Sequence, residues 1–167
     1  TFALYFGDSL FSPFFSLYFA STYLSQNEKD ILIALIPFFF FAGNIFFSMF
    51  ETSWKRNIWL LRIISIIEAV SVLLFGVWQS FYILLPITIF AALHNSCLFG
   101  LIDGMGAASA KRNNISFSSI RVLGGVGYIA GSLFGYFLLD SIGYTIMFGV
   151  SALFLFLLGP LSFLLAP

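Results

Sequence analysis

An acid and a guanidinium lie inside two neighbouring apolar stretches of this chain, and their types and spacing favour binding chemistry. Asp103 precedes the polar segment 111–114, and Arg121 follows that segment at the start of the next apolar stretch. If both stretches are helical, each charge lies about 13 Å from the hairpin tip, because a helix rises about 1.5 Å per residue. Opposite charges at equal depth on adjacent antiparallel helices can pair. An isolated charge in hydrocarbon is costly, so such a pair indicates a functional site.

The alternative is a structural salt bridge that only fixes the hairpin. Buried ion pairs are poor stabilisers and persist where another role retains them, so the sequence favours a substrate or coupling site beside a water-filled cavity. Tyr128 lies seven residues after Arg121, two helical turns along the same face. A guanidinium, a carboxylate and an aromatic ring together suit a polyol, through hydrogen bonds to hydroxyl groups and ring stacking. Ordinary packing of Tyr128 is the competing interpretation.

Two further acids inside apolar stretches are candidates for proton coupling. Glu68 falls near the middle of its stretch, where a neutral carboxylic acid is less costly than a carboxylate. It is therefore a candidate proton carrier, or else a protonated acid that hydrogen-bonds to a neighbouring helix. Asp8 lies five residues before Pro13, where a helix is expected to kink. Asp8 is the second candidate, facing the same cavity.

No metal site and no cofactor are expected. His94 is the single histidine and Cys97 the single cysteine, which excludes a His-Glu-x-x-His motif and a cysteine-built site. His94 and Asn95 lie mid-stretch, where a lone histidine is more often a packing residue than a ligand. Asn44 is expected to hydrogen-bond between helices.

The composition identifies an all-α integral membrane protein. Of 167 residues, 60% are hydrophobic and 8% are charged, which no ordinary soluble domain matches. The net charge is zero, so nothing favours a nucleic-acid partner. The expected surroundings are a lipid bilayer.

Six transmembrane helices are predicted, each near or above the ~20 residues that a bilayer requires. Apolar stretches of this length are helices rather than barrel strands. Acids at the ends of the second and fifth stretches, Glu51 and Asp140, are a weak sign of an inverted three-plus-three repeat. The predicted spans are 1–24, 30–50, 58–78, 81–108, 116–139 and 144–165.

Glycines spaced by four mark one face of the fifth predicted span. Gly127, Gly131 and Gly135 form this row, and Gly124 extends it. Small residues at this spacing let two membrane helices approach closely. Close packing against a neighbouring helix is therefore expected here.

Basic residues predict the orientation. The positive-inside rule places the loops after the second and fourth spans, and both termini, in the cytoplasm. The predicted location is the plasma membrane. The cytoplasmic side carries Lys55, Arg56, Arg62, Lys111 and Arg112, and the opposite side carries Lys29.

The segment 116–128, Ser-Phe-Ser-Ser-Ile-Arg-Val-Leu-Gly-Gly-Val-Gly-Tyr, resembles the start of the fifth helix in the major facilitator superfamily. It is most similar to the branch that holds the lactose permease and the phenylpropionate and nucleoside permease-like transporters. Pro13-Phe-Phe-Ser-Leu-Tyr18 is similar to the first helix of that branch. The resemblance covers the chain as the N-terminal six of twelve helices. It implies that Asp103, Arg121 and Tyr128 bind the substrate.

The loop signature of that family, Gly-x-x-x-Asp-Arg-x-Gly-Arg-Arg, is only partly present. Glu51 stands at the aspartate position, and Lys55 and Arg56 form the basic pair. Since this loop gates the conformational change in the family, the resemblance assigns gating to these three residues. The remaining signature positions hold other residues: Phe47, Thr52 and Trp54.

Together these features predict a secondary active transporter and not an enzyme. It would move a small polar solute, such as a sugar, oligosaccharide or nucleoside, together with a proton by alternating access. Its partner would be a C-terminal six-helix half in the same longer chain. One alternative is a non-transporting six-helix membrane subunit or remnant. An intramembrane hydrolase is less favoured, because the chain lacks a Gly-x-Ser-Gly motif and has one histidine.

Overall fold

The computed structural model describes residues 1–49 and 53–164, and within these ranges the chain is helical with no strand. Four helices are long and apolar enough to cross a bilayer: α3, α4, α5 and α6. The expected all-α membrane class is therefore confirmed, whereas six separate spanning helices are not. The elements are α1 (Phe2–Ser9), η1 (Ser12–Phe14), α2 (Phe15–Ser21), α3 (Gln26–Ser48), α4 (Trp54–Val77), α5 (Phe81–Arg112), α6 (Phe117–Leu161) and η2 (Ser162–Leu164).

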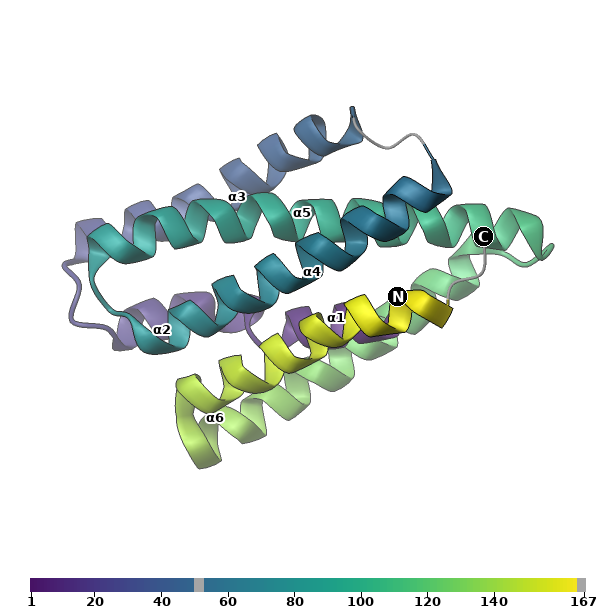
Figure 1. Ribbon diagram of the computed structural model, residues 1–167. Coiled ribbons are helices and arrows are strands. Elements are labelled where there is room, and N and C mark those ends of the chain that lie inside the picture. The colour runs from purple at the N-terminus through teal and green to yellow at the C-terminus, as the bar shows by residue number, and fades with distance from the viewer. Residues whose placement is uncertain (50–52, 165–167) are drawn as a thin grey trace.

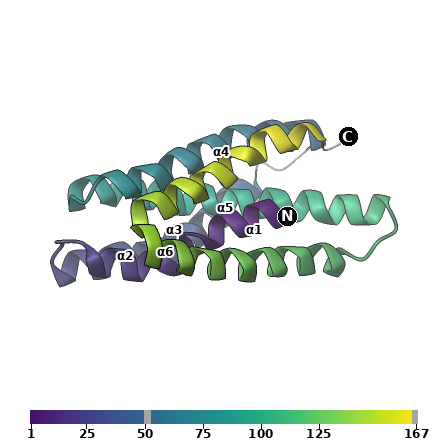
Figure 2. The same ribbon diagram turned by 90° about the horizontal axis from the view of Figure 1, so that it is seen from below.

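The first predicted span is broken near its middle. Helix α1 ends at Ser9, and Pro13 lies in the short 3-10 helix η1 that precedes α2. Proline lacks a backbone N–H and its ring obstructs the preceding turn, so a continuous helix cannot run through it without distortion. The kink expected near Pro13 is thus confirmed. The two short helices follow one another along the bundle, α1 beside α6 and α2 next to α3 (Figures 1 and 2).

The fifth and sixth predicted spans form two arms of one element, α6. A straight helix of its 45 residues would be about 68 Å long, roughly twice the thickness of the hydrocarbon layer. Gly143 interrupts α6 with φ +81° and ψ 178°, a backbone conformation that favours glycine. The chain folds back there, and the two arms run antiparallel (Figure 1).

The bundle is assembled from close helix pairs. Helix α1 packs mainly on α6, α3 on α5, and α4 on both α5 and α6. Much of the core between them is phenylalanine. Its largest fully buried side chains include Phe11, Phe19, Phe75 and Phe148.

The predicted glycine face of α6 makes the close approach to α1. A Cβ atom on Gly127 would lie 2.8 Å from the Phe2 carbonyl oxygen, and one on Gly131 would lie 2.5 Å from the Phe6 carbonyl oxygen. Neither position has space for a side chain. The glycines are therefore required by packing, as the spacing predicted.

Polar side chains at the helix ends satisfy backbone groups that helices leave unpaired. The Tyr18 hydroxyl donates to the carbonyl oxygens of Phe75 and Trp78 at the end of α4. Helix α3 begins four residues before the predicted residue 30, because Ser25 and Glu28 form a capping box. The hydroxyl and backbone N–H of Ser25 lower the pKa of Glu28.

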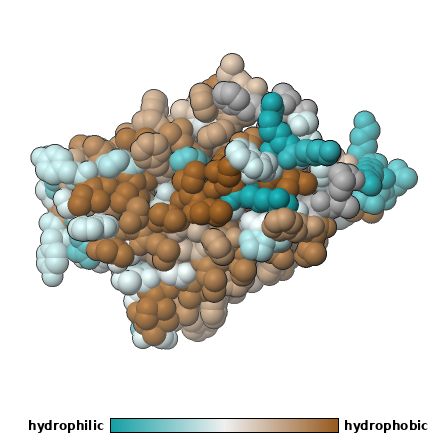
Figure 3. Space-filling model, in the orientation of Figure 1, coloured by the Kyte–Doolittle hydropathy of each residue, from teal (hydrophilic) through white to brown (hydrophobic). Residues whose placement is uncertain are grey.

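The surface is divided as expected for a bundle in a bilayer. In Figure 3 apolar side chains cover the middle of the visible face, and hydrophilic side chains gather at the end where α5 meets α6. Many large aromatic and aliphatic side chains of the helices are exposed, among them Phe38, Phe41, Ile129, Leu133 and Phe137. These helices present their apolar side chains outward.

A matched pair of glycine variants tests the α1–α6 contact. Gly131→Ala should lower the thermal unfolding temperature of the purified protein in detergent, because its methyl group overpacks the Phe6 backbone at a cost of about 1–3 kcal/mol. Gly125→Ala on the same helix is the control, since no atom lies within 4 Å of its Cβ position. It should leave the unfolding temperature unchanged or raise it. Equal effects of the two variants would contradict the close contact.

Candidate functional site

The predicted ion pair forms between α5 and α6. The Arg121 Nη2 atom lies 3.3 Å from the Asp103 Oδ2 atom, so the two charges stand at the same depth as expected. The Tyr5 side chain, which α1 contributes, lies beside Arg121. The Arg121 guanidinium carbon lies 5.9 Å from the centre of the Phe117 ring. Three elements therefore converge on one guanidinium.

This ion pair lies at the surface of the bundle. The Arg121 side chain is 57% exposed and that of Asp103 is 26% exposed. An exposed pair adds little to stability. Because the Arg121 side chain is exposed, its guanidinium donors are available to another molecule. Only one or two of the five N–H donors of an arginine are used by such a pair.

No contact in the described chain links Tyr128 to the ion pair. It is half-buried, and within residues 1–49 and 53–164 it makes no hydrogen bond or ring contact. Tyr5 provides the aromatic hydroxyl at Arg121 instead. In the sequence, Tyr5 lies about one helical turn before Asp8. This spacing did not identify Tyr5 as a site residue, because the neighbours of its helix could not be deduced.

The two proton-coupling candidates are joined by one asparagine. The Asn95 Nδ2 atom donates to Asp8 Oδ1 at 2.7 Å and to Glu68 Oε1 at 3.3 Å. Asp8 is 4% exposed and Glu68 is fully buried. Three helices, α1, α4 and α5, thus meet at one amide group.

The break in the first span shapes this cluster. Ser12 opens η1, and its hydroxyl donates to Asp8 Oδ2 at 3.0 Å. Asp8 therefore accepts a hydrogen bond at each carboxyl oxygen. In Glu68, by contrast, the buried Oε2 atom has no hydrogen-bond partner among the described residues.

A cavity of about 190 Å³ adjoins the acid cluster. Asp8, Glu68 and Asn95 line its polar end, together with Thr88, whose buried Oγ1 atom has no hydrogen-bond partner in the described chain. Most of the remaining wall is apolar. Asn95 and Thr88 were not predicted as site residues. Their spacing of seven on α5 put them on one face, but nothing indicated that the acids lay opposite.

One stripe of α5 connects the cavity to the ion pair. Asn95, Phe99 and Asp103 are spaced by four, so they lie on the same helix face. Phe99 lines the cavity, and its ring meets the Tyr5 ring edge-on at 4.9 Å between centroids. Since Tyr5 also lies beside Arg121, the Tyr5–Phe99 ring pair lies between the two polar groups.

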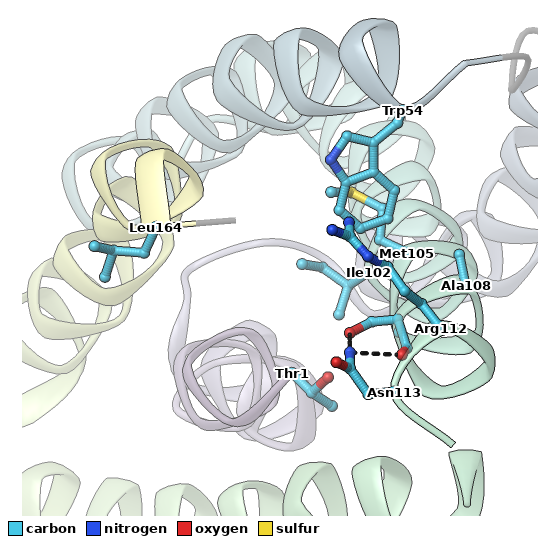
Figure 4. Close-up of a pocket in the computed structure, with 10 residues that line it drawn as sticks. Thr1, Trp54, Ile102, Met105, Ala108, Arg112, Asn113 and Leu164 are labelled. Atoms are coloured by element: carbon cyan, nitrogen blue, oxygen red, sulfur yellow. Dashed lines mark hydrogen bonds between the residues drawn. The ribbon is translucent and has the colours of Figure 1, made fainter. Parts of the chain in front are cut away.

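A second cavity, of about 500 Å³, lies where α5 ends. In Figure 4 the α5 residues stand on one side of it and Leu164 on the other. Asn113 is fixed there by its hydrogen bonds to the carbonyl and hydroxyl oxygens of Ser109. Neither Asp103 nor Arg121 lines this cavity or the smaller one, so the water-filled cavity expected beside the ion pair stays a prediction.

Two of the three predicted gating residues, Lys55 and Arg56, lie near this end of the bundle. Lys55 and Arg56 fall in the first turn of α4, next to Trp54, which lines the larger cavity. Glu51 lies outside the described residues, so its part in gating stays a prediction.

His94 packs between aromatic rings. It stacks on Phe90 at 6.1 Å between centroids and lies 6.4 Å from Phe47. No group of three His, Cys, Asp or Glu side chains within the described ranges could hold a metal ion. Asn44 was expected to hydrogen-bond between helices, but in the described chain it donates to the Phe40 carbonyl oxygen of its own helix at 3.2 Å.

A helical bundle with an apolar surface and polar groups bridging its helices indicates a multi-pass membrane protein. The MFS_1 like family matches residues 1–166. The chain therefore belongs to the MFS_1 like family, a relation to the major facilitator superfamily that points to a transporter. Searches of curated proteins and of solved structures return no match.

The bridging role of Asn95 can be tested with two asparagine variants. Asn95→Leu removes the donor shared by two buried acids, and unsatisfied buried groups cost about 1–3 kcal/mol each, so the unfolding temperature in detergent should fall. Asn44→Leu is the matched control and should change it little, since Asn44 bonds only within its helix. An Asn95→Leu variant as stable as the Asn44→Leu variant would contradict the bridge.

Proposed function

We propose that this protein is a secondary active transporter that moves a small polar solute together with a proton by alternating access. The observation that carries the proposal is the Asp103–Arg121 pair at 3.3 Å, because an exposed guanidinium and a carboxylate held together offer donors and acceptors to one solute. Family membership supports the transporter class.

Solute recognition is assigned to Asp103 and Arg121, with Tyr128 as a further candidate. A guanidinium donates along a rigid planar fork, and the carboxylate accepts from hydroxyl groups. The Tyr5 hydroxyl beside Arg121 adds a group that both donates and accepts. A sugar, an oligosaccharide or a nucleoside carries enough hydroxyl groups to engage these side chains at the same time.

Proton coupling is assigned to Glu68 and Asp8. A proton removes the charge that hydrocarbon surroundings disfavour, and Asn95 links both acids to the α5 face that carries Asp103. A change in the charge of the acids can thus reach the solute site through one helix. This link supports coupling between the two events.

The larger assembly follows from the same proposal. The described bundle would act as the N-terminal half, built as an inverted three-plus-three repeat, and would rock against a C-terminal half around the solute. Lys55 and Arg56, with Glu51, would gate this motion on the cytoplasmic side. The excess of basic residues at that end supports a cytoplasmic N-terminus in the plasma membrane.

Removal of the guanidinium is the direct test of solute recognition. Arg121→Ala should reduce uptake of the transported solute to background, because the variant lacks the charged donor fork. Uptake can be measured with radiolabelled lactose and uridine in proteoliposomes that contain the full-length protein. Lys111→Ala, an exposed cation at the end of α5, is the control and should transport normally. Normal uptake by Arg121→Ala, with equal insertion of both variants, would refute the assignment.

Proton coupling makes a separate prediction. Accumulation of the solute should require a pH gradient, and Glu68→Gln should abolish accumulation while leaving solute exchange at equal concentrations. Glu28→Gln is the matched control, because glutamine also completes a capping box. Accumulation that persists in Glu68→Gln and collapses with the gradient would assign the proton to another residue.

A further inference from the structure

The cavity beside the acid cluster has features that proton coupling leaves unused. A proton needs only a carboxyl oxygen, whereas this cavity has a volume of about 190 Å³. Cavities of about 150 Å³ hold molecules the size of benzene. The space next to Asp8 and Glu68 is therefore large enough for a small organic molecule.

The wall of the cavity is aromatic on several sides. Helices α1, α3, α4 and α5 and the segment between α1 and α2 each contribute to it. The faces of aromatic rings attract cations, and the attraction is stronger where water is excluded. The lining phenylalanines are Phe11, Phe15, Phe40, Phe75 and Phe99.

Two polar atoms of the residues that line the cavity have no hydrogen-bond partner in the described chain. Asn95 gives its amide N–H groups to the two acids, and Ser12 gives one hydroxyl to Asp8. Glu68 Oε2 and Thr88 Oγ1 are buried and unpartnered among the described residues. Glu68 is 0% exposed and Thr88 is 1% exposed, so bulk water does not supply the missing partner.

We propose that this cavity binds a small organic ammonium ion with an apolar body about the size of benzylamine. Its N–H groups donate to Glu68 Oε2 and Thr88 Oγ1, and its positive charge offsets the negative charge of the acids. Its apolar body lies against the phenylalanine rings. The site is distinct from the proposed solute site at Asp103 and Arg121.

An alkali cation fits this cavity less well. A small metal ion needs a shell of several oxygen ligands, and it would leave most of the apolar volume empty. No third acid, histidine or cysteine joins Asp8 and Glu68 in the described chain. The apolar, aromatic wall favours a ligand that carries hydrocarbon as well as charge.

Direct binding to the full-length protein in lipid nanodiscs tests the proposal. Radiolabelled benzylamine at pH 7 should bind saturably by equilibrium dialysis. Benzyl alcohol, which has the same ring but no charge, should not displace it. Replacement of isosmotic sucrose by sodium chloride separates an alkali-ion site from an ammonium site.

Two variants locate the ligand. Thr88→Val keeps the shape and removes an unpartnered hydroxyl, so the protein should fold at least as well while benzylamine affinity falls about three- to tenfold. Glu68→Gln should weaken binding about tenfold or more, because hydrogen bonds to charged groups are stronger. Glu28→Gln is the matched control and should bind normally.

The outcomes separate the alternatives. Saturable binding that falls in both cavity variants and persists in the control supports the proposal. Absence of saturable binding, displacement by benzyl alcohol, or unchanged affinity in a folded Thr88→Val variant overturns it. Sodium that abolishes the signal at millimolar concentration assigns the site to an alkali ion and also overturns it. None of these results depends on solute uptake, so the transporter proposal is tested independently.

Discussion

The paired hydrogen bonds from Asn95 to Asp8 and Glu68 are the interaction on which the interior of this bundle depends. Hydrocarbon offers no hydrogen-bond partners, so each polar group buried by the helices must be satisfied within the protein. One amide serves two acids from two other helices. This fixes the relative positions of α1, α4 and α5 more strictly than interchangeable apolar contacts can.

The two polar groups of the bundle differ in what surrounds them. The acid cluster is buried beside a cavity that several phenylalanines line, whereas the Asp103–Arg121 pair is partly exposed. A buried group of acids is suited to holding a compact positive charge, and an exposed ion pair is suited to meeting a hydrated solute. Asn95, Phe99 and Asp103 lie on one face of α5. One helix therefore holds residues of both polar groups at a fixed spacing.

Features governed by one helix or one hairpin could be predicted from the sequence. The Asp103–Arg121 pair follows from equal depth on a hairpin, and the break near Pro13 follows from proline chemistry. The glycine row of α6 follows from its spacing. Asn95 could not be assigned, because its role depends on which helices face α5, and that arrangement has no local signal. Among the described residues Tyr128 makes no hydrogen bond or ring contact, and this has the same origin: spacing gives its face on α6 but not what lies opposite.

The distribution of packing partners has a mechanical consequence. Helix α1 is wedged into the glycine face of α6, and Ser151 on the second arm of α6 donates to the Gly7 carbonyl oxygen. Helix α3 is matched with α5. Among the described residues, the hydrogen bond between Asn95 and Asp8 and the ion pair between Arg121 and Asp103 join the α1–α6 pair to the α3–α5 pair. If one helix pair slid past the other, both polar contacts would break together. The two contacts therefore resist such sliding jointly.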